Sequence, residues 1–169
     1  MSIGIRLKAD RIQGLSPFVG LSLCQFLGSD LKIKWPNDLM LADQKVGGVL
    51  IESKSQAQMA EIAIGIGINL LDLQSQRYLG LKKQVDPEKI AEDFFNKVTK
   101  FEAQGFAPFK DAFENQMWRV GRDVELEING EKKRIQIVGV SEAGSLITRE
   151  GETYELSDQG EILLSGYSS

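Results

Sequence analysis

Three short segments of the sequence combine glycine or proline with polar side chains, and these residue types suit a site for a small anion. Glycine lets backbone N–H groups come close to a ligand, and lysine supplies the charge that holds a carboxylate or a phosphate. The segments are Lys34-Trp35-Pro36-Asn37-Asp38, Lys45-Val46-Gly47-Gly48 and Gly65-Ile66-Gly67-Ile68-Asn69.

Lys45 stands directly before Val46 and the paired glycines Gly47 and Gly48. A lysine beside exposed glycine N–H groups can hold a carboxylate and a phosphate close together. A reaction that joins two anions needs this neutralisation of charge. Because the pattern is short, a lysine in a surface turn is the alternative interpretation.

The first segment offers Lys34, Asn37 and Asp38. Lys34 alternates with Ile33 and Trp35 on a predicted strand, so its ammonium group faces either a ligand or solvent. Asn37 and Asp38 either make side-chain hydrogen bonds within a turn, or recognise a nucleotide through the amide while the carboxylate orients a lysine or Mg²⁺. We interpret Trp35 as a packing residue.

The third segment ends a predicted strand with two unlike faces. Strand alternation places aliphatic side chains on one face and small residues on the other. The aliphatic face holds Ile62, Ile64, Ile66 and Ile68, and the small-residue face holds Ala63, Gly65, Gly67 and Asn69. The bare face suits either a ligand or a helix that crosses the strand. Asn69 is either a cap at the strand end or an amide that faces adenine.

Composition excludes several classes of function. The chain of 169 residues has no histidine, which removes Ser-His and Cys-His nucleophile pairs and the commonest zinc ligand. Cys24 is the only cysteine, so we expect no disulfide framework and a cytoplasmic protein. The net charge of −4 argues against non-specific nucleic-acid binding. No apolar run reaches the length of a membrane span, so we expect no membrane contact.

Local signals predict the elements that position these segments. Ser16-Pro17 is typical of a helix start, with Ser16 as the N-cap, and Gly28 suits the end of that helix. Alternation predicts strands over residues 1–7, 31–35, 46–52 and 61–69, with a turn at 37–38.

The second half of the chain predicts helices followed by short strands. Asp86-Pro87 begins a helix that Gly105 ends, and a shorter helix follows over residues 109–118. Beyond Gly121, alternating strands over 124–128 and 134–140 flank the hairpin signal Asn129-Gly130. Gly144 and Glu150-Gly151 supply further turns, so these last residues predict a small antiparallel barrel.

In their order and spacing, the three segments resemble the catalytic core of biotin–protein ligases, the enzymes that attach biotin to a lysine of a carrier domain. All five residues from Lys34 to Asp38 match the family pattern, and the second match extends to Glu52. The resemblance covers the whole chain. It implies an α+β fold: a mixed β-sheet with helices packed on one side, of the class II synthetase-like ligase type, followed by a small SH3-like β-barrel. Residues 1–118 would form a partial biotin/lipoate-ligase-type catalytic domain, and residues 119–169 the SH3-like C-terminal domain.

The resemblance also implies an activity and its residues. Biotin and ATP, with Mg²⁺, would give biotinyl-5′-AMP, and the biotin would then pass to a lysine of a biotin carboxyl carrier protein. We expect no tightly bound prosthetic group and no metal ligands among the site residues, and a homodimer is plausible. Lys45 corresponds to the catalytic lysine. The biotin site would comprise Lys45, Gly47, Gly48, Gly65 and Gly67, and the ATP site Lys34, Asn37, Asp38 and Asn69.

The chain departs from the family in what precedes its sheet. A Gly-Arg-Gly-Arg-type loop over the adenylate and a Ser-Thr-Asn piece at the biotin ureido ring are expected upstream of Met1, and neither occurs in the sequence. We therefore interpret the chain as an N-terminally truncated ligase without a DNA-binding helix-turn-helix. Two alternatives stay open: a non-catalytic remnant that binds a ligand or carrier, and a relative that acts on lipoate or octanoate.

Overall fold

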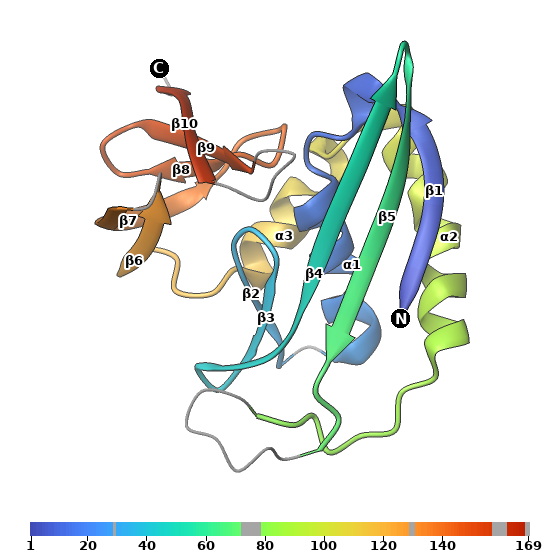
Figure 1. The fold of residues 1–169 in the computed structure, drawn as a ribbon. Helices are drawn as coiled ribbons and strands as arrows, with labels where there is room; N and C mark the ends of the chain where they lie inside the picture. Colours follow the sequence, from blue (N-terminus) through green and yellow to red (C-terminus); the bar gives the residue numbers. More distant parts are fainter. Residues whose placement is uncertain (29, 72–78, 129–130, 157–161, 168–169) are drawn as a thin grey trace.

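Tight turns join four successive strands of this chain into antiparallel neighbours. The computed structural model describes residues 1–28, 30–71, 79–128, 131–156 and 162–167 (Figure 1). Its first sheet has the strand order β1-β5-β4-β3-β2. The strands are β1 (Ser2–Lys8), β2 (Lys32–Lys34), β3 (Asp38–Leu41), β4 (Gln44–Gln56) and β5 (Met59–Ile68).

The prediction of a mixed sheet is wrong, because every strand pair of this sheet is antiparallel. The connections between β2, β3, β4 and β5 are only a few residues long, and such short links join antiparallel strands. The predicted strands over 1–7, 31–35, 46–52 and 61–69 are confirmed. Strand β3 was not predicted, and it begins at Asp38, where the sequence predicted a turn.

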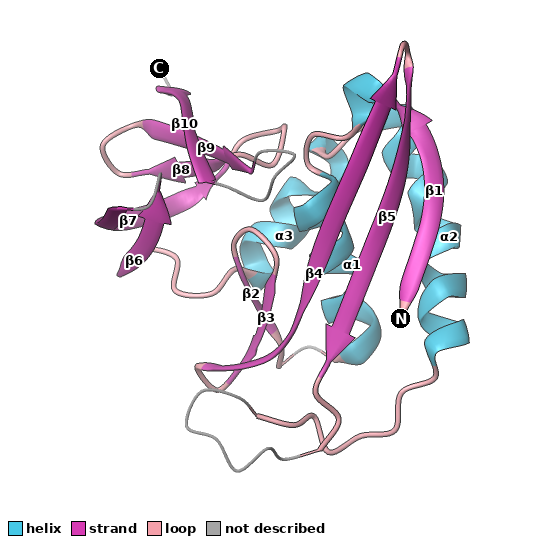
Figure 2. Ribbon diagram, in the orientation of Figure 1, coloured by secondary structure: helices cyan, strands magenta, loops and turns pink. Residues whose placement is uncertain are grey.

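Three helices cover one face of this sheet, as predicted (Figure 2). They are α1 (Leu15–Leu27), α2 (Pro87–Gln104) and α3 (Lys110–Gln116), with short 3₁₀ turns η1 (Ala9–Arg11) and η2 (Ala107–Phe109). Phe18 of α1 stacks on Phe101 of α2 with ring centroids 4.6 Å apart. The core lies between these helices and the buried face of the sheet, to which β5 contributes Ile62 and Ile64.

The start predicted for the first helix is wrong, whereas that of the second is confirmed. Helix α1 begins at Leu15 after Gly14, and Ser16 does not cap it. The Ser16 hydroxyl instead donates to the Pro36 carbonyl oxygen over 3.4 Å, so a tertiary contact replaces the local cap. At α2, the Asp86 carboxylate accepts from the Glu88 N–H, as its Asp-Pro signal predicts.

The second sheet follows the helices and has the order β10-β9-β8-β7-β6. Its strands are β6 (Asp123–Ile128), β7 (Glu131–Val140), β8 (Leu146–Thr148), β9 (Glu152–Leu156) and β10 (Ile162–Tyr167). The outermost strands β6 and β10 contact one another, so the sheet curves back on itself. The predicted strands over 124–128 and 134–140 are confirmed, and the Asn129-Gly130 hairpin lies outside the described residues.

Buried polar contacts fasten the second sheet to the first part of the chain. The Trp35 indole N–H donates to the Gly144 carbonyl oxygen over 3.0 Å, and the Val140 N–H donates to the Glu114 carboxylate over 3.0 Å. Trp35 is only 3% exposed, which confirms its interpretation as a packing residue. In the described part of the chain, no helix has both the length and the apolar character that crossing a membrane requires.

Candidate functional site

A bulge in the β3–β4 hairpin turns Lys45 toward Asp38. The pairing shifts between Leu39↔Gly47 and Met40↔Lys45, so Val46 is an extra residue on β4. In a regular strand, Lys45 and Gly48 would point to opposite faces, and a bulge can re-aim a side chain. The Lys45 ammonium group lies 2.5 Å from the Asp38 carboxylate.

Gly48 leaves the space that this ion pair occupies. A Cβ atom at Gly48 would lie 3.3 Å from Asp38 Oδ1 and 3.5 Å from Lys45 Cε. The Lys45 side chain is 38% exposed and that of Asp38 22%, so solvent and small ligands reach the pair. An ammonium group in this position can receive an incoming anion and share its charge with Asp38.

Asn37 is tied to β4 through both its side chain and its backbone. Its Nδ2 group donates to the Val49 carbonyl oxygen over 2.8 Å, and the Val49 N–H donates to the Asn37 carbonyl oxygen over 2.9 Å. Both bonds run to β4 and not within the turn, so they differ from the local turn role that was one alternative for Asn37. The contact of Asn37 with a nucleotide stays a prediction.

A cavity of about 430 Å³ brings residues of all three sequence segments together. It includes the Lys45–Asp38 pair and the bare backbone of Gly65 and Gly67 on β5. The lining residues are Met1, Asn37, Asp38, Lys45, Gly48, Val49, Leu50, Gly65, Ile66 and Gly67. One wall can therefore neutralise an anion, while another lets a ligand lie directly on strand backbone.

The two faces of β5 differ as the alternation predicts. Ile62, Ile64 and Ile66 are buried, whereas Ala63 and Gly67 are exposed. The helices lie on the opposite face of the sheet, so in the described part of the chain no helix crosses the bare face (Figure 2). A Cβ atom at Gly67 would meet open space, which leaves room for a ligand.

Leu50 is a lining residue that the sequence analysis missed. It pairs with Gly65 across β4 and β5, and it is 58% exposed, which is high for a leucine. The signal was available, because alternation along β4 places Leu50 on the same face as Gly48. Leu50 adds an apolar side chain to a cavity whose other features are charge and backbone.

Three predicted site residues lie outside the lining of this cavity. A Cβ atom at Gly47 would lie 2.5 Å from the Gly67 carbonyl oxygen, so the close approach of β5 requires a glycine there. Lys34 places its ammonium group 5.9 Å from the centre of the Trp118 ring. The Asn69 N–H donates to the Val46 carbonyl oxygen over 2.7 Å and extends the sheet. Their roles toward biotin and ATP stay predictions.

Two other cavities of the described residues contain neither Lys45 nor Asp38. A cavity of about 360 Å³ between the start of α1 and the loop at Gly144 has no charged residue in its lining. A shallow cavity of about 570 Å³ lies over β1, where Arg6 pairs with Glu61 at 3.6 Å. Among the described residues, no group of three or more cysteine or carboxylate side chains could hold a metal ion.

The structure thus has an α+β core with a lysine, a carboxylate and bare strand backbone on one open face of its sheet. The model of the biotin/lipoate A/B protein ligase family matches residues 12–69. The chain is therefore similar to this family over residues 12–69, and the resemblance predicted from its three segments is confirmed.

Individual relatives support the same assignment. The bifunctional ligase/repressor BirA of Escherichia coli is 29% identical over 170 residues, which cover 89% of this chain and 53% of that protein. A biotin–[acetyl-CoA-carboxylase] ligase of Paracoccus denitrificans is 26% identical, with 92% and 72% covered. The chain thus spans about half the length of the BirA protein it matches.

A solved structure shows the same fold. The apo biotin protein ligase of Aquifex aeolicus superimposes with a TM-score of 0.67 at 23% identity, and the match covers 99% of this chain and 80% of that one. The antiparallel sheet, the helices on one face and the second small sheet are therefore the fold that this chain shares with that protein.

Proposed function

We propose that this chain carries the catalytic site of an ATP-dependent biotin–protein ligase, which forms biotinyl-5′-AMP and transfers the biotin to a lysine of a biotin carboxyl carrier protein. The observation that carries this proposal is the Lys45–Asp38 pair beside the bare backbone of Gly65 and Gly67. The name of the Paracoccus denitrificans relative supports the choice of biotin.

In the first step, a carboxylate oxygen of biotin attacks the α-phosphorus of ATP. A phosphorus–oxygen bond forms, the bond between the α-phosphorus and the bridging oxygen breaks, and pyrophosphate leaves. Both reactants are anions, so their approach needs a positive charge between them. Lys45 supplies it, because its exposed ammonium group lies at the rim of the β5 backbone and is already oriented by Asp38.

In the second step, the uncharged amine of the carrier lysine attacks the carbonyl carbon of the mixed anhydride. A carbon–nitrogen bond forms, and the bond between the carbonyl carbon and the phosphate oxygen breaks, so that AMP leaves. The nitrogen releases its proton to solvent. The exposed face that carries the cavity suits this step, since a carrier domain can approach it without displacing a helix.

The remaining residues have distinct roles in this proposal. Gly48, Gly65 and Gly67 let biotin lie close to the sheet, and Gly47 holds β5 near enough to form that wall. The ATP side would use Asn37, Asp38, Asn69 and Lys34. Residues 1–118 would form the catalytic unit, and residues 119–169 an SH3-like domain in a cytoplasmic protein.

The donor groups fit a magnesium ion that accompanies ATP. Mg²⁺ is usually bound by one or two carboxylates together with substrate phosphates, and Asp38 is the carboxylate that lines the cavity. When bound, Mg²⁺ neutralises phosphate charge. Asp38 would help to hold it, while its ion pair with Lys45 keeps that ammonium group directed at the reacting oxygens.

Biotin-dependent release of pyrophosphate from Mg-ATP tests the proposal. We expect Lys45→Ala to lower the rate by about a hundredfold or more, as for other losses of a group that stabilises transition-state charge. Lys54→Ala is the matched control, because Lys54 lies on the same strand and outside the proposed site. Equal rates for the wild type and Lys45→Ala would contradict the assignment of Lys45.

A second candidate substrate follows from the family, whose name includes lipoate ligases. The apolar Leu50 side chain beside the cavity would also accommodate an octanoyl or lipoyl chain. Thermal stabilisation by biotin but not by lipoate supports the biotin proposal, and stabilisation by lipoate alone would replace it. Tight biotin binding without pyrophosphate release would indicate a non-catalytic binding module.

A further inference from the structure

Asp43, at the tip of the β3–β4 hairpin, contacts two consecutive residues that follow α3. The Trp118 indole N–H donates to Asp43 Oδ1 over 2.6 Å, and Arg119 Nη2 lies 3.2 Å from Asp43 Oδ2. The Arg119 guanidinium also lies 4.3 Å from the centre of the Trp118 ring. Each of these three side chains therefore touches the other two, and we call the group Asp43–Trp118–Arg119 the hairpin clamp.

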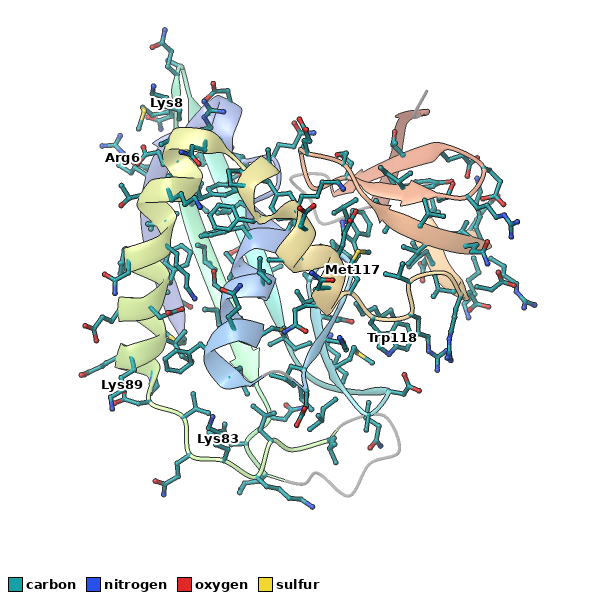
Figure 3. The ribbon with its side chains drawn as sticks, turned by 180° about the vertical axis from the view of Figure 1, so that it is seen from behind. Arg6, Lys8, Lys83, Lys89, Met117 and Trp118 are labelled. Atoms are coloured by element: carbon teal, nitrogen blue, oxygen red, sulfur yellow. The ribbon has the colours of Figure 1, made fainter. Side chains whose placement is uncertain are left out.

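The clamp joins segments that are far apart in the sequence. Trp118 lies where the chain leaves α3 for the second sheet (Figure 3). Its backbone N–H donates to the Ile33 carbonyl oxygen over 2.8 Å, so Trp118 is anchored to β2 as well. The hairpin tip is thus held against the segment that follows α3.

Backbone conformation at the clamp also requires support from its surroundings. Ala42, Asp43 and Arg119 have φ angles of 48°, 66° and 57°, in the left-handed region that residues with a Cβ atom rarely adopt. Such conformations persist where surrounding contacts hold them. The bonds among Asp43, Trp118 and Arg119 supply such contacts at two of these three residues, Asp43 and Arg119.

The hairpin needs this support because its own pairing is irregular. Asp43 precedes Lys45 by two residues, and the bulge at Val46 interrupts the ladder between Leu39 and Met40. A bulge locally disrupts the hydrogen bonds that would fix the strand. The orientation of Lys45 therefore depends on contacts outside this ladder. The Leu79 N–H donates to the Lys45 carbonyl oxygen over 3.0 Å, and the clamp holds Asp43 two residues before Lys45.

We propose that the hairpin clamp positions Lys45 by fixing the tip of the β3–β4 hairpin against the segment after α3. The part of this inference that concerns catalysis rests on the proposed function, whereas the fixing of the hairpin does not. Asp43, Trp118 and Arg119 are positioning residues, since none of them lines the cavity.

The clamp acts on local order rather than on global stability. The Asp43 side chain is 61% exposed, and exposed ion pairs contribute little to the free energy of unfolding. A hairpin tip, in contrast, can open locally while the rest of the protein stays folded. Removal of the clamp should therefore change the hairpin and leave the unfolding temperature nearly unchanged.

Backbone hydrogen exchange over residues 39–47 tests the structural part. We expect Asp43→Ala and Trp118→Phe each to speed exchange there by about tenfold, because each removes one side of the clamp. The matched control is Glu125→Gln, which breaks the Glu125–Lys132 pair at a similar exposure of 63% and leaves the hairpin untouched. Hairpin exchange that stays within about twofold of the wild type in both clamp variants overturns the proposal.

Steady-state kinetics of pyrophosphate release test the positioning of Lys45. We expect kcat to fall by about tenfold in Asp43→Ala with the KM for biotin nearly unchanged, because a misplaced lysine loses interactions made in the transition state. Asp43→Asn keeps an acceptor for the Trp118 N–H and should recover part of kcat. Faster hairpin exchange with unchanged kcat overturns the positioning role.

The two measurements separate this inference from the proposed function. A wild-type protein that releases no pyrophosphate contradicts the proposed function, and the exchange measurement then still decides whether the clamp fixes the hairpin. A wild-type protein that is active, with clamp variants equal to it in both measurements, contradicts this inference alone.

Discussion

Trp35 and Gly144 are 109 residues apart in the sequence, and a hydrogen bond of 3.0 Å joins the indole N–H of the first to the carbonyl oxygen of the second. Trp35 stands in the turn that leads to Asn37 and Asp38, and Gly144 belongs to the second sheet's loop 141–145. The turn that carries the site is therefore braced by the C-terminal part of the chain.

Trp35→Phe should destabilise the protein, because it leaves the Gly144 carbonyl oxygen without this buried donor. Loss of one partner of a buried hydrogen bond costs about 1–3 kcal/mol of the free energy of unfolding. Urea unfolding followed by circular dichroism measures the change. A midpoint equal to that of the wild type would show that this bond does not brace the turn.

Gly67 and Gly47 should respond oppositely to a side chain, although both were assigned to the biotin site. Gly67→Val places its methyl groups in open space, so the protein should fold normally and lose biotin binding. Gly47→Ala forces a Cβ atom against the Gly67 carbonyl oxygen, and such overpacking costs about 1–3 kcal/mol of stability. Calorimetry with biotin and thermal unfolding together separate the two effects. Undiminished biotin affinity in Gly67→Val would remove the bare face from the site.

The two-faced character of β5 could be predicted because it depends on strand alternation alone. The start of helix α2 could be predicted equally well, because the cap that Asp86 forms before Pro87 depends only on neighbouring residues. The bulge at Val46 was not predicted, because the glycines beside it, Gly47 and Gly48, were interpreted as part of a ligand site and not as a sign of irregular pairing. Strand β3 was missed for a different reason: its turn uses Ala42 and Asp43 in left-handed conformations, without the glycine that usually marks such a hairpin.

Some site residues could be placed only with tertiary contacts. Ser16 has the local chemistry of a cap, but its hydroxyl group bonds to Pro36 in the folded protein. Lys34 alternates correctly for a ligand-facing residue, yet its ammonium group lies over Trp118, which is distant in the sequence. Sequence patterns predicted which segments meet at the cavity, and long-range packing decided which side chains line it.

Cys24 should be inert in the folded protein. Burial raises the pKa of its thiol to about 12, and nearby Lys32 opposes this shift only weakly. The reactive thiolate is therefore nearly absent at about pH 8. Mass spectrometry after iodoacetamide treatment should find no adduct in native protein and complete labelling in urea. Rapid labelling of the native protein would contradict the buried position of Cys24.

Acid should release the hairpin clamp. The hydrogen bond from Arg119, and then that from Trp118, lowers the pKa of Asp43 below its ordinary value of 3.8. The charge of Arg122 also lowers the pKa of Asp43. The Lys34 ammonium group lies 5.9 Å from the centre of the Trp118 ring. The pKa of Asp43 is lower in the folded state than its ordinary value. The clamp therefore stabilises the hairpin fully at pH values above 3.8, and this stabilisation is lost as the pH falls through the lowered pKa.

Hydrogen exchange of the hairpin as a function of pH checks this expectation. After correction for intrinsic rates, exchange over residues 39–47 should stay constant from about pH 7 to about pH 4 and rise below that range. Asp43→Asn should show faster exchange throughout with no such rise. A rise centred well above pH 4 in the wild type would indicate that another group controls the hairpin.

The central claim is that Lys45 joins biotin to ATP, and direct detection of biotinyl-5′-AMP tests it most directly. The purified chain, Lys45→Ala, Lys45→Arg and the Lys54→Ala control are incubated with biotin and Mg-ATP, and the adenylate is quantified by mass spectrometry in single-turnover samples. We predict adenylate in the wild type and Lys54→Ala, at least about a hundredfold less in Lys45→Ala, and an intermediate amount in Lys45→Arg. Equal amounts in the wild type and Lys45→Ala, or none in the wild type, would contradict the account.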